Sequence, residues 1–528
     1  NMGEIRLLDC TLRDGGYIND WKFGKETISG ILDRLALAEI DLIECGFITE
    51  KTVNENYSLF ADADVINGYV KQPSAKSMYV AMIAIGEKEI NPELICDAAD
   101  TIIDGIRITF HPDEIKKAFE WANILKKKGY NVFIQPVGSA NYDDELILDI
   151  IKKVNQLKPF AFYIVDTLGA MSENDMMHML HIIDRNLDEN VKLGYHSHNN
   201  LQLAFANAQR MMEFGTNRDV IIDCSVYGMG RGAGNLCTEL MVDYMKKRYN
   251  KNYDTVPILE IVDNYLLPIY MQKRWGYTVE YFLASSLDCH PSYVTYLMDK
   301  QNIPVRVIRN MLEQIPKEKR LRYNADVINN IYNKYQNNYV DDKDEILKLR
   351  SEFKGKEVLI IGSGKSVKTK NDKIRKYIDK NKPKVISINF VPSLKTDMVF
   401  IANQKRFEMI KDSLDMKNVI CTSNINGDIN EGHIVNYSTL LNSGSIVSDS
   451  SGMMLLKLLK RLKVSKVIVA GMDGFKKNYL ENYCEKRFLH EEDKTTLSEK
   501  NKEMSEQFRL IKKDINIEFI TPSKYETK

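Results

Sequence analysis

The sequence predicts two α/β units, a (β/α)8 TIM barrel with a helical extension followed by a smaller doubly wound, Rossmann-like domain. Three observations favour this fold class. Short apolar strands alternate with amphipathic helices over the first 250 residues, these strands number eight, and a second, shorter series of strands begins at Lys356. An open doubly wound sheet has the same alternation, so it is the competing interpretation. We favour the barrel for the first series because eight is the number of strands that closes.

The composition is that of an ordinary soluble protein. Its 528 residues include 73 Lys plus Arg and 73 Asp plus Glu, so no strong net field attracts nucleic acid or an anionic membrane. The eight cysteines show no paired spacing, so we expect reduced thiols in a cytoplasmic protein. We expect neither a signal peptide nor a membrane span, because the N-terminus enters a strand directly and no run of about 18 apolar residues occurs.

The expected barrel strands are short apolar runs with polar residues at their ends. They are predicted at residues 5–9, 41–45, 78–83, 105–110, 132–136, 162–166, 191–196 and 220–225. Helical periodicity is found at 25–36, 113–128, 144–157, 173–186 and 201–214. The carboxyl ends of barrel strands meet on one face, where barrel enzymes carry their active sites. The polar residues there include Arg, His and Gln, which are poor helix caps, so we interpret this face as an active site.

Two polar motifs at strand ends supply a candidate metal site. His196 and His198 stand at alternate positions after an extended segment, so their imidazoles point the same way. The alternative is that both are polar loop residues that cap the next helix. A second polar patch, far away in sequence, contains Asp14. One carboxylate and two imidazoles suit Mn²⁺, Zn²⁺, Fe²⁺ or Mg²⁺ and leave positions open for a substrate.

This ligand set suits chemistry next to a keto group. A 2-oxo acid would chelate the cation through its carboxylate and keto oxygens, and Arg13 would stabilise the charge that develops on the enolate oxygen. The Gly-rich loop at 228–235 lets its backbone approach a ligand, although a flexible cover loop has the same composition. We expect Arg107 and Gln135, at two further strand ends, to contact the substrate.

Five motifs in this order resemble the DRE-type TIM-barrel metallolyases over about residues 3–300. They are Asp9-x-Thr11-Leu12-Arg13-Asp14-Gly15, Ile43-Glu44-x-Gly46-Phe47, Asp166-Thr167-x-Gly169, His196-x-His198-Asn199 and the Gly-rich loop that ends at Gly234-Asn235. This superfamily includes 4-hydroxy-2-oxovalerate aldolase, hydroxymethylglutaryl-CoA lyase and the isopropylmalate and citramalate synthases. The resemblance implies a divalent metal, with Mn²⁺ preferred, that is bound by Asp14, His196, His198 and Asn235. It implies that Arg13 stabilises the enolate and that Glu44, Asp166 and Thr167 shape the site.

The sequence resembles the aldolases of this superfamily more than the acyl-CoA synthases. Its Gly-rich loop reads Gly-Arg-Gly-Ala-Gly-Asn and lacks the Glu-Arg pair of the synthases. One departure is that Tyr17 follows Arg-Asp-Gly-Gly, where the bacterial aldolases carry an acid/base histidine. Tyr17 is therefore a candidate acid/base, with packing as its alternative role, and His290 is a second candidate. A Claisen synthase that uses acetyl-CoA and a non-catalytic metal-binding recruitment module remain the alternatives.

The expected domain boundaries are a barrel at 1–250, a helical extension at 251–338, a charged linker at 339–355 and the Rossmann-like domain at 356–528. The linker shows no strand pattern, and a helical conformation is open to it. Strands of the last domain are predicted at 358–361, 385–389, 398–401, 419–422, 467–470 and 517–520, with a helix at 450–462. Gly362-Ser363-Gly364-Lys365-Ser366 follows the first of these strands and is a candidate phosphate loop. A plain tight turn is the alternative, and Leu359 stands where a Walker loop requires glycine.

This glycine loop belongs to a second, weaker resemblance. With Ile388-Asn389, Asp449-Ser450-Ser451-Gly452 and the segment 469–475, it resembles the MptE-like domain (archaeal hydroxymethylpterin diphosphokinase) and the bacterial CMP-dependent sialyltransferases. The resemblance implies a nucleotide or nucleotide-sugar site at Gly362, Gly364, Asn389, Ser451 and Asp473. Together the two parts imply an aldolase fused to a nucleotide-binding domain in surface-glycan biosynthesis. Its substrates would be a 2-oxo acid and an aldehyde or sugar-derived acceptor, and we expect a homo-oligomer.

Overall fold

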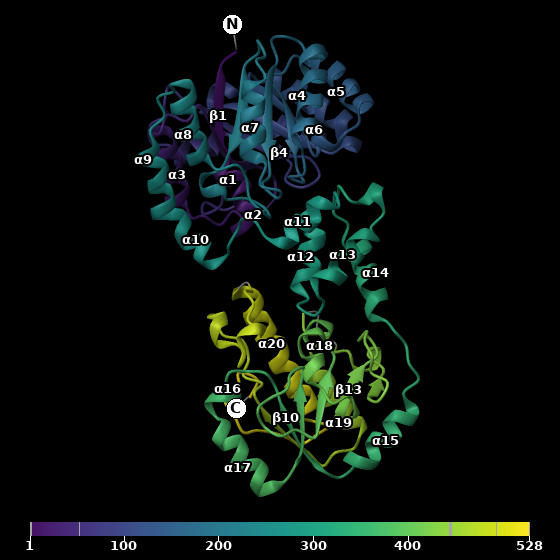
Figure 1. The fold of residues 1–528 in the computed structure, drawn as a ribbon. Helices are drawn as coiled ribbons and strands as arrows, with labels where there is room; N and C mark the ends of the chain where they lie inside the picture. Colours follow the sequence, from purple (N-terminus) through teal and green to yellow (C-terminus); the bar gives the residue numbers. More distant parts are fainter. Residues whose placement is uncertain (1–2, 52, 443–445, 493, 527–528) are drawn as a thin grey trace. The chain divides into compact units, whose positions relative to one another are not determined.

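The chain forms two compact units in a computed structural model that describes residues 3–51, 53–442, 446–492 and 494–526 (Figure 1). The first unit is Asn1–Val294 with Pro316–Tyr323, and the second is Thr295–Ile315 with Asn324–Lys528. The expected helical extension at 251–338 is therefore not a single extension of the barrel. Its residues are divided between the two units.

The first unit contains a parallel barrel of eight strands, as predicted. The strands are β1 (Ile5–Asp9), β2 (Leu42–Ile48), β4 (Met78–Ala84), β5 (Ile103–Phe110), β6 (Asn131–Pro136), β7 (Ala161–Asp166), β8 (Lys192–Ser197) and β9 (Val220–Cys224). β1 pairs with β9 on one side and with β2 on the other, and the second pairing closes the sheet. The short strand β3 (Leu59–Phe60) adds to the end of β2. The open-sheet alternative is thus wrong for this unit.

Helices surround the barrel, but not after every strand. The α-helices of this unit include α1 (Thr11–Asp14), α2 (Gly16–Asn19), α3 (Lys25–Leu37), α4 (Ile115–Lys127), α5 (Asp144–Leu157), α6 (Glu173–Asn186), α7 (Ala204–Glu213), α8 (Thr238–Tyr249), α9 (Thr255–Ile261), α10 (Leu267–Gln272) and α11 (Val279–Ser286). The connections after β2 and β4 contain short 3-10 helices instead. The expected eight strand–helix units are therefore eight strands with two irregular connections.

Side chains inside the barrel form an apolar layer and, farther along the strands, a polar layer. The apolar layer includes Leu8, Leu42, Val80, Phe133, Tyr163 and Ile221. Strand side chains alternate between faces, so the residues two positions later also point inward. Those residues include Glu44, Gln135 and Asp223, which are almost completely buried. The barrel geometry thereby gathers charged groups beneath the face where the strands end.

The second unit is built on a seven-stranded parallel sheet with helices on both faces. In sheet order the strands are β14 (His433–Val435), β13 (Val419–Thr422), β12 (Met398–Ile401), β11 (Lys384–Ile388), β10 (Glu357–Ile361), β15 (Lys466–Ala470) and β16 (Ile517–Phe519). The strand order reverses once, between β10 and β15. The six predicted strands are all present, and β14 is an additional one.

Two hydrophobic cores lie on opposite faces of β10. Val358 and Ile360 pack with helices α15, α19 and α20, whereas Leu359 and Ile361 pack with α16 and α17. α12 (Pro291–Asp299) begins in the first unit and ends in the second. The other helices of the second unit are α13 (Val305–Glu313), α14 (Ala325–Gln336), α15 (Lys343–Phe353), α16 (Ser366–Thr369), α17 (Asn371–Asn381), α18 (Gln404–Ile410), α19 (Ser451–Arg461) and α20 (Lys494–Ile511). Within the described residues, none of the helices in either unit has the length and apolar character that crossing a membrane requires.

The segment expected as a charged linker, 339–355, is mostly the helix α15, a conformation that the sequence left open. Its Ile346, Leu349 and Phe353 are buried in the core of the second unit, and the charged residues cover the remaining faces of the helix. Charged residues outnumber apolar ones in this segment, but helical spacing places these three apolar residues on one face.

We expect Leu349→Ala to destabilise the second unit by about 2–5 kcal/mol, since it empties a fully buried position in α15. Leu347 lies two residues earlier in the same helix and is 59% exposed, so Leu347→Ala is the matched control and should change little. Urea unfolding followed by circular dichroism measures both variants. Equal effects of the two substitutions would show that α15 is not part of the core.

Candidate active site

The four predicted metal ligands converge at the carboxyl ends of β1, β8 and β9. The Nε2 atom of His196 lies 3.2 Å from Oδ2 of Asp14, and the Nε2 atom of His198 lies 3.8 Å from the same oxygen. The side-chain amide of Asn235 donates a hydrogen bond to this oxygen as well. All four side chains are buried. Groups that lie more than 180 residues from Asp14 in sequence thus face its carboxylate.

The Gly-rich loop holds Asn235 against the end of β8. Asn235 donates its backbone N–H to the carbonyl of Gly228 at 3.0 Å, and Asn199 donates to the carbonyl of Gly234 at 2.9 Å. Gly234 has a φ of +78°, and a Cβ atom there would lie 2.2 Å from the Gly228 carbonyl oxygen. Only glycine fits that position. The loop therefore positions Asn235, which is a more specific role than a flexible cover.

The donor set fits a divalent cation with mixed nitrogen and oxygen ligands. The amide oxygen of Asn235 is buried and has no hydrogen-bond partner, so it remains available as a ligand. Burial lowers the pKa of His198 to about 3, which keeps this imidazole in the neutral form that binds metals. Burial opposes ionisation of Asp14, but the Arg13 cation and the two imidazoles outweigh it and hold the pKa of Asp14 well below its usual value.

Cys10 is a residue that the sequence did not single out at this site. Its sulfur and ligand atoms of Asp14 and His196 all lie within 4.8 Å of one another. Burial raises the pKa of the Cys10 thiol well above its usual value, so the thiol keeps its proton. A protonated thiol is a poor metal ligand, and the oxygen and nitrogen donors remain the better set.

A chain of buried ion pairs connects the metal-site residues to the barrel interior. Glu44 accepts a hydrogen bond from Nε of Arg13 at 2.6 Å and another from Nη1 of Arg107 at 2.6 Å. Arg107 also pairs with Asp223, whose Oδ2 lies 2.9 Å from Nδ1 of His196. With Asp14, the chain contains two guanidinium cations and three carboxylates. Its one excess negative charge suits a bound cation.

Asp223 is a functional residue that sequence reasoning missed. It accepts hydrogen bonds from Arg107 and from the hydroxyl of Tyr163, and it occupies the Nδ1 side of His196. This contact leaves Nε2 of His196 facing Asp14, and such outer partners fix the orientation of a ligand imidazole. The available signal was a lone acid in the apolar strand 220–224, at an inward-facing position.

Arg107 and Gln135 do not lie where a substrate would meet them first. Arg107 is completely buried, and its guanidinium also donates to the amide oxygen of Gln135. Because Glu44, Asp223 and Gln135 take up its donors, Arg107 acts on the site through its neighbours. Contact of Arg107 and Gln135 with the substrate stays a prediction.

Arg13 retains a free donor at the site. Its Nε is held by Glu44, and its Nη1 lies 3.8 Å from Asp14, but its Nη2 is buried without a hydrogen-bond partner. A buried guanidinium N–H without a partner carries a large desolvation cost. An oxyanion placed beside it would remove that cost.

Asp166 and Thr167 organise the loops around the site. The Asp166 carboxylate accepts hydrogen bonds from the backbone N–H groups of Ala170 and Met171, both at 3.1 Å. The hydroxyl of Thr167 accepts one from the backbone of Gly138 at 2.9 Å. Burial raises the pKa of Asp166 to about 6. These contacts agree with a role in shaping the site.

The two acid/base candidates differ in their surroundings. The hydroxyl of Tyr17 donates to Glu87 at 3.0 Å, and burial raises its pKa, so Tyr17 holds its proton at neutral pH. Nδ1 of His290 accepts a hydrogen bond from the backbone of Ser292 at 3.1 Å. Burial lowers the pKa of His290 well below its usual value, and the Arg231 cation adds to this effect, so the imidazole is neutral. Tyr17 is suited to donate a proton and His290 to accept one.

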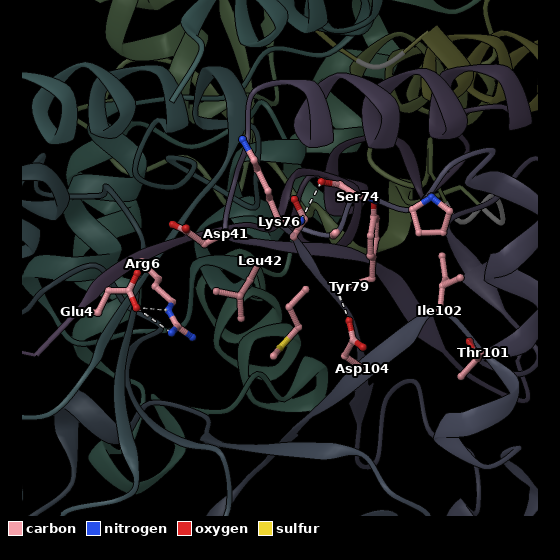
Figure 2. Close-up of a pocket in the computed structure, with 14 residues that line it drawn as sticks. Glu4, Arg6, Asp41, Leu42, Ser74, Lys76, Tyr79, Thr101, Ile102 and Asp104 are labelled. Atoms are coloured by element: carbon pink, nitrogen blue, oxygen red, sulfur yellow. Dashed lines mark hydrogen bonds and ion pairs between the residues drawn. The ribbon is translucent and has the colours of Figure 1, made fainter. Parts of the chain in front are cut away.

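A surface pocket of about 630 Å³ lies at the opposite end of the barrel (Figure 2). It is lined by residues near the amino ends of β1, β2, β4 and β5, among them Arg6, Asp41, Tyr79 and Asp104. Asp41 accepts hydrogen bonds from the Leu7 backbone and from the Tyr253 hydroxyl, and Asp104 accepts one from the Tyr79 backbone. Residues at this end of a barrel usually serve stability, so the pocket is separate from the candidate site.

The predicted nucleotide residues of the second unit mostly have partners within the fold. The Asp473 carboxylate accepts hydrogen bonds from the backbone and hydroxyl of Ser366, so it occupies the start of α16 itself. Added Cβ atoms at Gly362 and Gly364 would lie 2.6 and 2.5 Å from the Gly471 carbonyl oxygen, so these glycines allow two loops to pack closely. Asn389 accepts from the backbone of Ala402 at 3.0 Å. Ser451 begins α19, and a nucleotide site at these residues remains a prediction.

The N-terminal part of the chain is similar to known lyases. Residues 4–264 match the family model described as HMGL-like. The 4-hydroxy-2-oxovalerate aldolase of Bacillus cereus is 24% identical over 271 residues, which cover 50% of this chain and 76% of the aldolase. The oxaloacetate decarboxylase of Mycobacterium tuberculosis is 24% identical over 253 residues, which cover 46% of this chain and 71% of the decarboxylase.

A solved structure matches the same part of the chain. The N-terminal domain of a Bacteroides vulgatus protein is 27% identical, with a TM-score of 0.46, and the match covers 56% of this chain and 96% of that domain. The family match and the closed barrel agree with the resemblance found in the motifs. Residues 4–264 of this chain are therefore similar to the HMGL-like family.

Proposed function

We propose that the barrel is a divalent-metal-dependent aldolase or lyase that makes or breaks a carbon–carbon bond next to the enolate of a pyruvate-type 2-oxo acid. The observation that carries this proposal is the convergence of His196, His198 and Asn235 on one Asp14 oxygen, beside an unpaired N–H of Arg13. Cleavage of 4-hydroxy-2-oxovalerate and decarboxylation of oxaloacetate both yield pyruvate, so the two relatives support a shared enolate.

Each residue of the site has a separate task in this proposal. Asp14, His196, His198 and Asn235 would hold the ion, which supplies Lewis-acid stabilisation to the keto oxygen when it is bound. Glu44 orients Arg13 through Nε, and the free Nη2 of Arg13 donates to the developing oxyanion. A preoriented donor in a buried site stabilises such charge more strongly than water does.

Tyr17 is the residue that we assign to proton transfer. We expect Tyr17→Phe to lower turnover by about 10²- to 10³-fold, because general acid catalysis contributes effects of this size. The affinity for Mn²⁺ should stay unchanged, since Tyr17 donates to Glu87 and not to a predicted metal ligand. His290→Gln is the matched comparison, measured by steady-state turnover. If only the His290 variant loses activity, the assignment passes to His290.

The test of the proposed reaction is deuterium exchange into the methyl group of pyruvate in D2O, followed by proton NMR. It needs no knowledge of the acceptor. We expect no exchange after chelation and full exchange when Mn²⁺ is restored, and a parallel sample with acetyl-CoA tests for thiol release. Thiol release without pyruvate exchange would favour the Claisen synthase. Metal binding with neither activity, even with aldehyde acceptors present, would favour the recruitment module.

We further propose that the second unit binds a nucleotide or nucleotide sugar and links the barrel to surface-glycan biosynthesis. Support comes from its parallel sheet, in which the strand order reverses once, between β10 and β15. Parallel sheets of this kind bind ligands at the carboxyl ends of the strands beside such a reversal. Thermal unfolding with a panel of nucleotides and nucleotide sugars tests the proposal. At least one of them should raise the unfolding temperature of the second unit, and a flat panel would contradict it.

A further inference from the structure

Arg406, in the first turn of α18, is a largely enclosed cation of the second unit that has no carboxylate partner. No Asp or Glu oxygen among the described residues lies within 4.0 Å of its guanidinium nitrogens. Its guanidinium carbon lies 3.6 Å from the ring centroid of Phe488 and 5.0 Å from that of Tyr483. The nearby Glu485 is instead paired with Arg487 at 2.6 Å. Burial lowers the pKa of Arg406, so the fold penalises its positive charge and an anion would relieve that penalty.

The aromatic contacts of Arg406 leave its hydrogen-bond donors available. A guanidinium stacks on a ring through its flat face, whereas its five N–H groups lie in the guanidinium plane. The side chain of Arg406 donates from Nη1 to the hydroxyl of Ser363 at 3.5 Å, and it also makes a hydrogen bond with the hydroxyl of Tyr483. Most of its donors therefore remain free to meet a ligand at the edge of the guanidinium.

Ser363 belongs to the glycine loop after β10, in which every second backbone amide makes a hydrogen bond within the fold. The amides of Gly362, Gly364 and Ser366 donate to Ala470, Gly471 and Asp473 respectively, each at 2.8 Å. The amides of Ser363 and Lys365 donate no hydrogen bond to any described residue. Backbone amides that are left free in a tight loop can serve as donors to an anion.

A further contact fixes this loop relative to Arg406. Cys484 donates its backbone N–H to the Ser363 carbonyl at 2.9 Å, and Cys484 follows directly on Tyr483, one of the rings beside Arg406. Asn403 caps α18 by accepting the Arg406 backbone N–H at 3.0 Å. The hydroxyl of Ser363 and the guanidinium are thus held together by the fold.

We propose that Arg406, the Ser363 hydroxyl and the free amides of Ser363 and Lys365 form a binding site for a phosphoryl group, as in pyrophosphate or a nucleoside diphosphate. The Asp473 carboxylate takes the amide of Ser366, the first residue of α16, so the proposed site uses only the amides that precede it and the side chains of Arg406 and Ser363. It rests on the proposed nucleotide role only for the identity of the molecule that carries the phosphate. A forked guanidinium matches phosphate oxygens better than a point charge does.

The experiment is calorimetric titration of the full chain with inorganic pyrophosphate. We expect Arg406→Gln to weaken binding about 10- to 100-fold, the range of one lost hydrogen bond between charged groups. Ser363→Ala, which leaves the aromatic stack intact, should weaken binding by a smaller factor. Arg487→Gln is the matched control, because Arg487 also lies over Phe488 but is exposed and paired with Glu485. Its affinity should equal that of the unchanged protein.

Two results would overturn the site: no binding of pyrophosphate by the unchanged protein, or equal affinity in the Arg406→Gln variant. The second would mean that Arg406 serves only to stack α18 on the aromatic rings, visible as a lower unfolding temperature with unchanged affinity. A titration with cytidine diphosphate separates the site from the nucleotide role. If cytidine diphosphate binds no more tightly than pyrophosphate, the anion site stands and the nucleotide role fails. If cytidine diphosphate binds the unchanged protein and the Arg406→Gln variant with equal affinity, the nucleotide role stands and the Arg406 assignment fails.

Discussion

Asp14→Asn is expected to reduce metal-dependent exchange of pyruvate by at least about 10³-fold, because it removes the only carboxylate among the predicted metal ligands. Two imidazoles and the Asn235 amide face this one carboxylate, and nothing else in the set supplies negative charge to a cation. Circular dichroism should remain that of the unchanged protein, since Asp14 follows β1 and makes no contact in the strand ladder.

The matched control for Asp14 is Asp20→Asn. Asp20 lies six residues later in the same segment, at the end of α2, and its side chain is exposed. This variant should keep full exchange activity. Full activity in the Asp14 variant would contradict the assignment of the ligand set, whatever the behaviour of the control.

Asp223→Asn is expected to have the largest effect on stability, together with a weaker metal site. Removing one partner of a buried ion pair costs about 3–5 kcal/mol, because the remaining charge loses its compensation. Here Arg107 would keep only Glu44 as an ionic partner, and Nδ1 of His196 would lose its carboxylate acceptor. Loss of such an outer partner typically weakens metal affinity by about 10- to 100-fold. Urea unfolding and Mn²⁺ titration measure the two effects.

A double variant separates these two effects of Asp223. Arg107→Met combined with Asp223→Leu removes both charges, so it should recover part of the lost stability. It restores no acceptor for His196, so the Mn²⁺ affinity should stay low. An unchanged Mn²⁺ affinity in Asp223→Asn would show that this residue does not support the ligand imidazole.

The sequence was most informative where local signals agree with the fold. The helices 144–157 and 173–186 were predicted with their observed bounds, because Asp143 and Ser172 cap them and apolar residues recur at helical spacing. In residues 339–355 the charge density hides the buried face of α15, which only packing in the core of the second unit reveals.

The residues of the candidate site also fall into those that the sequence predicted and those that it did not. Asp14, His196, His198 and Asn235 could be predicted to lie together because they stand in motifs that follow strands, and the structure brings them together. Asp223 was missed because it lies within an apolar strand, and only barrel closure brings it to Arg107 and His196. For the glycines of the 362–366 loop, the sequence could not distinguish a ligand from close packing of two loops, because the partner loop lies more than 100 residues away.

The central claim is that Asp14, His196, His198 and Asn235 hold one divalent ion in the barrel. Electron paramagnetic resonance of Mn²⁺ titrated into the metal-free protein tests it most directly, with pulsed detection of ligand nitrogens. We predict one Mn²⁺ per barrel with coupling to two imidazole nitrogens, and loss of one coupling or of binding in each of His196→Ala and His198→Ala. A Mn²⁺ signal without nitrogen coupling, or one that both variants leave unchanged, would contradict the claim.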